Sequence, residues 1–120
     1  MEFKENPAIY IQIAEYVCEQ ILLKKWKLGD KIISIRDLAV NMEVNPNTVQ
    51  RAYDFLQSSE IIYNKRGVGY FVVEDANTKI ISYRKKQFQE HELPGIFKSM
   101  KLLGMAIEDI DKQYEAYINQ

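Results

Sequence analysis

Cysteine and histidine are nearly absent from this chain, which has one residue of each, Cys18 and His91, among its 120 residues. A single cysteine excludes an internal disulfide bond, and a single histidine leaves too few ligands for a zinc-type site. His91 has two acidic neighbours, Glu90 and Glu92, but adjacent side chains of a helix point apart and cannot converge on one ion. We therefore expect no metal and no cofactor.

Long apolar runs are also missing. Runs such as Ile21–Leu23 fall far short of the roughly 20 apolar residues that a bilayer-spanning helix needs. The first residues, Met1 to Glu5, lack the pattern of a signal peptide. These observations predict a cytoplasmic protein without a membrane partner.

The chain has no excess of charge of either sign, since its formal net charge is −1. Any contact with nucleic acid must therefore come from a local basic patch. The length allows one small domain, or a small domain with an appendage, rather than a deep cleft between two domains. Because no Ser/His/Asp, Cys/His, phosphate-loop or metal pattern is present, we do not expect an enzyme.

The most informative segment that is present is Val44–Tyr53, which combines a helix start with a polar face. Asn45 is a good N-cap, and Pro46 fits the first helical position, whose N–H has no partner inside a helix. The apolar residues that follow recur at the spacing of one helix face: Val49, Ala52, Tyr53 and Leu56. The polar residues lie on the opposite face: Asn47, Gln50, Arg51 and Asp54.

Two helices are expected before this segment. The first runs from about Pro7 to Lys25, because Asn6-Pro7 is another start signal and apolar residues follow at a spacing of four. Ile32-Ile33 is a candidate for a very short strand. Ser34 and Asp37 resemble a capping box, which predicts a short helix from Ile35 to Met42. A short helix, a tight turn and a second helix with a polar face are typical of a helix-turn-helix.

A β-hairpin is predicted after Leu56. Ile61–Asn64 and Tyr70–Val73 are rich in β-formers, and the loop Lys65–Gly69 joins them. Glycine permits a positive φ and a close approach to another molecule, and Lys65 and Arg66 place two cations at the tip. We therefore predict that this hairpin is the wing of a winged helix-turn-helix.

From about Asp75 the pattern becomes helical, with a kink or restart at Pro94 and a last helix from about Ile107 to Ile118. The apolar faces of these helices need a partner surface, and a homodimer is the simplest one. The residues predicted for dimerisation are Phe88, Ile96, Phe97, Met100, Leu103, Ile107, Ile110 and Tyr114. The fold class is thus α+β and mainly α: a winged helix-turn-helix over residues 1–74, then a short α-helical dimerisation tail over 75–120.

With these pieces in place, the chain resembles the GntR family of bacterial transcription regulators, and its short tail resembles the YtrA-like subgroup. The resemblance covers Pro7 to Val73. Its motifs are Ile9-Tyr10-Ile11-Gln12-Ile13, Leu28-Gly29-Asp30-Lys31-Ile32, Ser34-Ile35-Arg36-Asp37-Leu38-Ala39, the segment Val44–Tyr53 and Arg66-Gly67-Val68-Gly69-Tyr70-Phe71-Val72. Two positions depart from the family pattern, Ile33 where proline is usual and Tyr70 where a small threonine is usual.

The resemblance implies a sequence-specific DNA-binding regulator from a subgroup whose members are often repressors of transporter operons. Because a homodimer presents two identical reading helices, we expect its operator to be an inverted repeat. The resemblance also implies DNA contacts by the residues matching Arg36, Asn45, Asn47, Thr48, Gln50 and Gly67. Many relatives have arginine where this chain has Pro46 and Gln50, so fewer cations lie on its reading helix.

Base-reading chemistry and structural roles both remain open for these residues. Asn and Gln can pair bidentately with adenine and Arg with guanine, but the same residues also occur on ordinary solvated helix faces. Thr48 is a candidate for a phosphate contact at the helix start. The full set predicted to contact double-stranded DNA is Arg36, Asn45, Pro46, Asn47, Thr48, Gln50, Arg51, Lys65, Arg66 and Gly67. A winged-helix protein-interaction module is the alternative function, and the sequence does not reveal a small-molecule effector.

Overall fold

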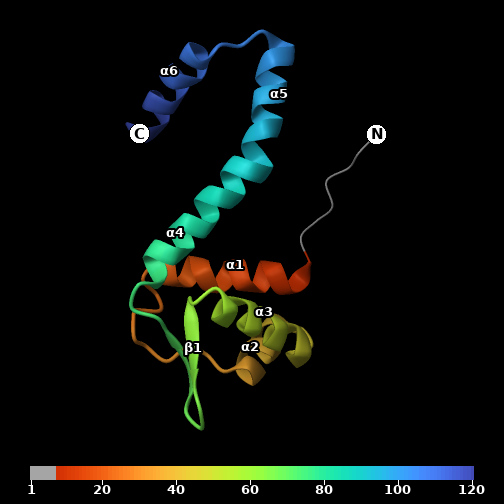
Figure 1. Ribbon diagram of the computed structural model, residues 1–120, viewed down its shortest axis with the longest axis vertical. Helices are drawn as coiled ribbons and strands as arrows, with labels where there is room; N and C mark the ends of the chain where they lie inside the picture. Colours follow the sequence, from red (N-terminus) through yellow and green to blue (C-terminus); the bar gives the residue numbers. More distant parts are fainter. Residues whose placement is uncertain (1–7) are drawn as a thin grey trace. The chain divides into compact units, whose positions relative to one another are not determined.

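The computed structural model describes residues 8–120, which group into two compact units, one ending at Ser82 and the other beginning at Tyr83. The first unit contains α1 (Ile9–Leu22), α2 (Ile35–Met42), α3 (Pro46–Ser58), β1 (Ile62–Lys65), β2 (Gly69–Val72) and the start of α4 (Ala76–Gln87). In this unit α1 lies across α2 and α3, and the β1–β2 hairpin extends away from α1 (Figure 1). The predicted division at residue 74 between DNA binding and dimerisation stays a prediction.

Helix α1 is shorter than the sequence predicts. The predicted start signal Asn6-Pro7 lies outside the described residues, and the helix begins at Ile9 with Ala8 as its N-cap. It ends at Leu22 rather than at Lys25, because Lys24 adopts a left-handed backbone with φ 61°. The regular spacing of apolar residues did not reveal this end, since Lys24 and Lys25 have good helix propensity.

The helix-turn-helix follows the predicted bounds. Ser34 caps α2 by accepting a hydrogen bond from the Asp37 N–H at 3.1 Å, and α2 spans Ile35–Met42 as predicted. Glu43 then takes a left-handed conformation with φ 56°, and the Val44 N–H donates to the Ala39 carbonyl at 3.0 Å. This turn lets α3 begin at Pro46 against the side of α2.

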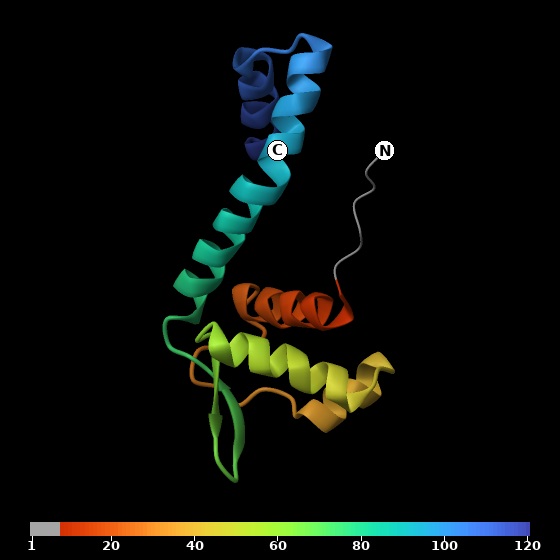
Figure 2. The same cartoon turned by 45° about the vertical axis from the view of Figure 1, so that its right-hand side comes forward.

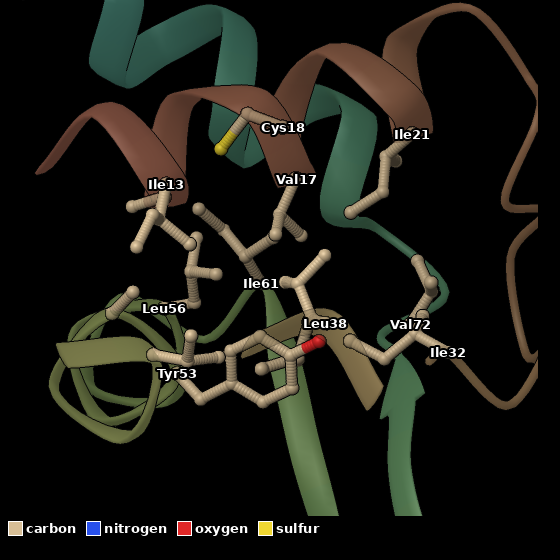
Figure 3. Packing of buried hydrophobic residues seen from close by; sticks show 14 of the residues in the cluster. Ile13, Val17, Cys18, Ile21, Ile32, Leu38, Tyr53, Leu56, Ile61 and Val72 are labelled. Carbon is tan, nitrogen blue, oxygen red and sulfur yellow. The ribbon is translucent and has the colours of Figure 1, made fainter. Parts of the chain in front are cut away.

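The core of the first unit lies between α1, α3 and the strands. Figure 3 shows side chains of α1, among them Ile13, Val17 and Ile21, directed toward residues of α3 and the hairpin. The predicted apolar stripe of α3 is confirmed, because each of its members is fully buried: Val49, Ala52, Tyr53 and Leu56. The aromatic residues Trp26, Phe55 and Phe71 are half-buried, and Trp26 and Phe55 pack against this core.

Tyr53 makes a specific polar contact inside this core. Its hydroxyl donates to the Ile33 carbonyl at 2.7 Å, which ties α3 to the segment that leads into α2. Burial raises the pKa of the Tyr53 hydroxyl well above its usual value, because the ionised form would lose its hydration inside the fold.

The predicted hairpin is confirmed, with a narrower loop. The antiparallel pairing runs from Ile62–Val72 to Lys65–Gly69, so Lys65 belongs to β1 and the loop is residues 66–68. The very short strand expected at Ile32-Ile33 is replaced by a single bridge between Lys31 and Phe71. The Ile32 N–H donates to the Tyr70 carbonyl at 2.9 Å, so this segment still adds to the edge of β2.

Helix α4 starts on the first unit. Ala76 and Ile80 are fully buried in its core cluster. Nearby, the Lys79 ammonium lies 2.6 Å from the Glu60 carboxylate, which lowers the pKa of Glu60 and raises that of Lys79. Because this pair is exposed, the buried apolar side chains hold the start of α4 more strongly than the ion pair does.

The second unit contains the end of α4, a π-helical segment η1 (Phe88–Glu92), α5 (Leu93–Leu103) and α6 (Ile107–Ile118). Figure 2 shows these helices in a second view. The predicted kink at Pro94 takes the form of η1, because the proline ring would clash with the carbonyl of Glu90 in a regular helix. Gly104, with φ 65°, ends α5, and α6 has the predicted bounds.

We predict that Tyr53→Phe lowers the free energy of unfolding by about 1 to 3 kcal/mol, because it removes a donor from the Ile33 carbonyl inside the fold. Urea denaturation of the purified variants measures this change. Tyr63→Phe is the matched control, because the Tyr63 side chain is 45% exposed. Equal stability of wild type and Tyr53→Phe would contradict the role of this hydrogen bond.

Candidate nucleic-acid interface

The start of α3 is built as predicted from an asparagine cap and a proline. The Asn47 N–H donates to Asn45 Oδ1 at 2.8 Å, and the Thr48 N–H donates to the Asn45 carbonyl at 2.9 Å. Pro46 at the first position has no N–H. The first-turn N–H groups are therefore already used within the chain, and this helix start can offer DNA its side chains and its dipole instead.

The polar face of α3 is exposed as the sequence predicts. Asn45, Pro46, Asn47, Gln50 and Arg51 are exposed, and Thr48 is half-buried. A concavity of about 320 Å³ lies between the starts of α1 and α3. It is lined by Ala8, Ile9, Tyr10, Asn45, Asn47, Thr48 and Arg51. Most of the predicted contact residues of α3 therefore line one concave surface.

Arg51 makes a contact that the sequence did not predict. Its guanidinium lies over the ring of Tyr10 in α1, with 3.9 Å between the guanidinium carbon and the ring centroid. Stacking engages the face of the guanidinium but leaves its edge N–H groups able to donate. This placement leaves Arg51 able to donate to a phosphate or to a guanine, and the guanine contact predicted for it stays a prediction.

Gln50 joins α3 to the wing. Its Nε2 donates to Asp54 Oδ1 at 2.9 Å and to the Tyr70 hydroxyl at 3.4 Å. The half-buried ring of Tyr70 packs edge-on against Tyr53, with 5.0 Å between the centroids, and its hydroxyl reaches Gln50.

The tip of the wing is exposed at Lys65, Arg66 and Gly67. Gly67 has φ 78°, a conformation that favours glycine in the turn. Gly69 has φ 142°, and a Cβ at this position would lie 2.8 Å from Cε of Lys31. The missing side chain thus lets Lys31 pass alongside the hairpin, where it adds a cation to those of Lys65 and Arg66.

Arg36 is exposed in the first turn of α2, outside the concavity of α3. The Ser34 hydroxyl and the acidic side chain of Asp37 serve this helix start, so a cation here has no role in capping. Arg36 is thus an exposed cation with no part in capping, and the DNA contact predicted for it stays a prediction.

Sequence reasoning missed three partners of the site because each comes from another element. Tyr10 supports Arg51 from α1, Lys31 reaches the wing from the segment before α2, and Tyr70 reaches Gln50 from β2. The only local signal was the departure from the family pattern at Tyr70.

Over residues 8–120 no helix is long and apolar enough to cross a membrane. The same residues contain no group of three His, Cys, Asp or Glu side chains placed to hold a metal ion.

Residues 9–72, which contain α1 to β2, match the family described as bacterial regulatory proteins, gntR family. Two relatives come from Bacillus subtilis (strain 168). The uncharacterized HTH-type transcriptional regulator YhcF is 35% identical over 109 residues, which cover 91% of this chain and 88% of YhcF. The HTH-type transcriptional repressor YtrA is 36% identical over 107 residues, which cover 89% of this chain and 82% of YtrA.

A solved structure is similar over nearly the whole chain. The putative GntR-family transcriptional regulator from Bacteroides thetaiotaomicron superposes with a TM-score of 0.82 at 45% identity, covering 93% of this chain and 97% of that one. These similarities confirm both the resemblance and the winged helix-turn-helix fold inferred from the sequence. The chain belongs to the gntR family of bacterial regulatory proteins and is a DNA-binding helix-turn-helix transcription regulator.

Proposed function

We propose that this protein is a homodimeric repressor that binds an inverted-repeat operator, with α3 of each protomer in the major groove. The observation that carries the proposal is the capped start of α3 with its exposed polar face, accompanied by exposed cations at Arg36 in the first turn of α2 and at the tip of the wing. The similarity to YtrA, a protein named as a repressor, supports repression rather than activation. The family resemblance further suggests an operon for a transporter as the target.

The contact residues divide into two groups by chemistry. Arg36, Lys31, Lys65 and Arg66 carry charge on elements that flank α3, and we assign them to phosphate contacts, which set position and affinity. Asn47 and Gln50 carry amides on the exposed face of α3, and we assign them to base edges in the major groove. Thr48 and Arg51 line the concavity at the start of α3 and serve the backbone that borders the groove.

The second unit supports the homodimer. Its helices expose large apolar side chains that no other residue within 8–120 covers: Ile96, Phe97, Leu102, Leu103, Ile107, Tyr114, Tyr117 and Ile118. Of the residues predicted for dimerisation, Met100 is only 8% exposed, so its side chain packs inside the tail and is not part of the exposed apolar surface. Ile110 is half-buried, and the others are exposed.

A homodimer with twofold symmetry fixes the form of the operator. Two identical reading helices bind two half-sites about 34 to 36 Å apart, or a multiple of one helical turn, so the operator is an inverted repeat. The DNA site can be selected from a random duplex library, which also supplies the duplex for the following measurements.

We predict that Arg36→Ala weakens binding to the selected duplex and to a scrambled duplex alike, by about 1 to 3 kcal/mol, because a phosphate contact carries no sequence information. Fluorescence anisotropy at several salt concentrations should also show that the slope of log K against log salt falls by about 1.

Lys25→Ala is the control for Arg36→Ala, because Lys25 is an exposed cation that follows α1 and belongs to no proposed contact. Loss of affinity in this control equal to that in Arg36→Ala would contradict a specific role for Arg36. Affinity of the wild type that does not change with salt would overturn DNA binding by phosphate contacts and favour a protein-interaction module.

We predict that Phe97→Glu weakens the homodimer by at least about 2 kcal/mol, or roughly thirtyfold, because it places a charge in the apolar surface of α5. Sedimentation equilibrium measures the dissociation constant. Leu23→Glu is the matched control, since Leu23 is 56% exposed but lies in the first unit, directly after α1. A monomeric wild type, or equal effects of the two variants, would contradict this dimer surface.

A further inference from the structure

The side chain of Gln50 is held in one orientation by two acceptors. Its Nε2 lies 2.9 Å from Asp54 Oδ1 and 3.4 Å from the Tyr70 hydroxyl oxygen. An ionised carboxylate accepts hydrogen bonds but cannot donate them. The amide nitrogen of Gln50, rather than its oxygen, must therefore face Asp54.

Both acceptors lie on the nitrogen side of the amide, Asp54 one turn further along α3 and Tyr70 on the wing. The carbonyl oxygen Oε1 is the part of the amide left to meet a ligand. A bidentate contact with adenine would need Nε2 as well, because it joins the amide oxygen to N6 and the amide nitrogen to N7.

The second acceptor is anchored in the core. The Tyr70 ring packs edge-on against Tyr53, whose side chain is fully buried and whose hydroxyl is bonded to the Ile33 carbonyl. A glutamine–aspartate pair one helical turn apart is weakly ordered when it stands alone. Here the pair is reinforced from a different element whose position is fixed by packing.

We propose that Asp54 and Tyr70 are positioning residues that turn the Oε1 atom of Gln50 toward the DNA, so that Gln50 selects bases carrying an amino group in the major groove. Adenine offers N6–H₂ and cytosine offers N4–H₂, whereas guanine and thymine present acceptors, O6 and O4. Gln50 therefore accepts adenine or cytosine and rejects guanine or thymine on the strand that it reads. This inference rests on the proposed function, because it requires α3 in the major groove.

Selection from a library of random-sequence DNA duplexes, followed by sequencing, tests the inference with the full chain. The base read by Gln50 is the one whose preference disappears in Gln50→Ala. At that base the wild type should enrich adenine and cytosine to within about threefold of each other, and both about tenfold over guanine and thymine. In Asp54→Ala the released Nε2 can reach N7, so adenine should exceed cytosine by about tenfold.

Three further variants separate orientation from charge. Asp54→Glu keeps a carboxylate that only accepts, and it should restore the equal use of adenine and cytosine. Tyr70→Phe keeps the ring against Tyr53 but loses the hydroxyl, and it should shift the preference toward adenine less than Asp54→Ala does. Asp37→Ala removes an exposed negative charge from the first turn of α2, and it should strengthen binding to all duplexes without changing the preferred base.

The outcomes distinguish this inference from the proposed function. If the wild type enriches no sequence, the proposed function fails. If the wild type enriches an operator but already prefers adenine over cytosine tenfold, or if Asp54→Ala leaves the preference unchanged, the inference alone is overturned. A preference in Asp37→Ala that shifts as in Asp54→Ala would show that charge, rather than orientation, sets the base, and it too would overturn the inference. Thermal unfolding followed by circular dichroism confirms that each variant remains folded.

Discussion

The burial of one stripe of α3 against α1 and the hairpin is the constraint on which the rest of the first unit depends. Val49, Ala52, Tyr53 and Leu56 lose all contact with solvent, so the helix cannot rotate without exposing apolar surface. The same burial decides which side chains face outward, since positions on a helix are fixed relative to one another. The exposed amides of Asn47 and Gln50 are therefore a consequence of the core as much as of the polar residues themselves.

Tyr53 links this core to the surface that we assign to DNA. Its hydroxyl fixes the segment before α2, its ring supports Tyr70 of the wing, and Tyr70 in turn reaches Gln50 on the same helix as Tyr53. Two parts of the surface, the reading helix and the wing, are thus held through one buried side chain. Such an arrangement limits the number of orientations that the surface must give up on binding, which reduces the entropic cost of recognition.

Local signals in the sequence were sufficient to predict much of the fold. Asn45-Pro46 and the Ser34–Asp37 pair fixed the starts of α3 and α2, because capping depends on residues close together in the chain. The end of α1 was predicted wrongly, since the left-handed backbone of Lys24 has no local signal. The sequence also did not predict contacts between elements. The contact of Tyr10 with Arg51 and that of Lys31 with Gly69 depend on tertiary packing, which residue spacing does not show. The burial of Met100 was not predicted either, because the helical spacing that places Met100 on the apolar face of the tail also places exposed residues there.

The central claim is that the start of α2, the exposed face of α3 and the wing form one surface for DNA. Titration of the isotopically labelled protein with the selected duplex, followed by amide chemical shifts, tests it most directly. We predict that the largest shift changes fall at Arg36, at Asn45, at Asn47 to Arg51 and at Lys65 to Gly67, with smaller changes along α1. Shift changes confined to α5 and α6, or none at all, would contradict it.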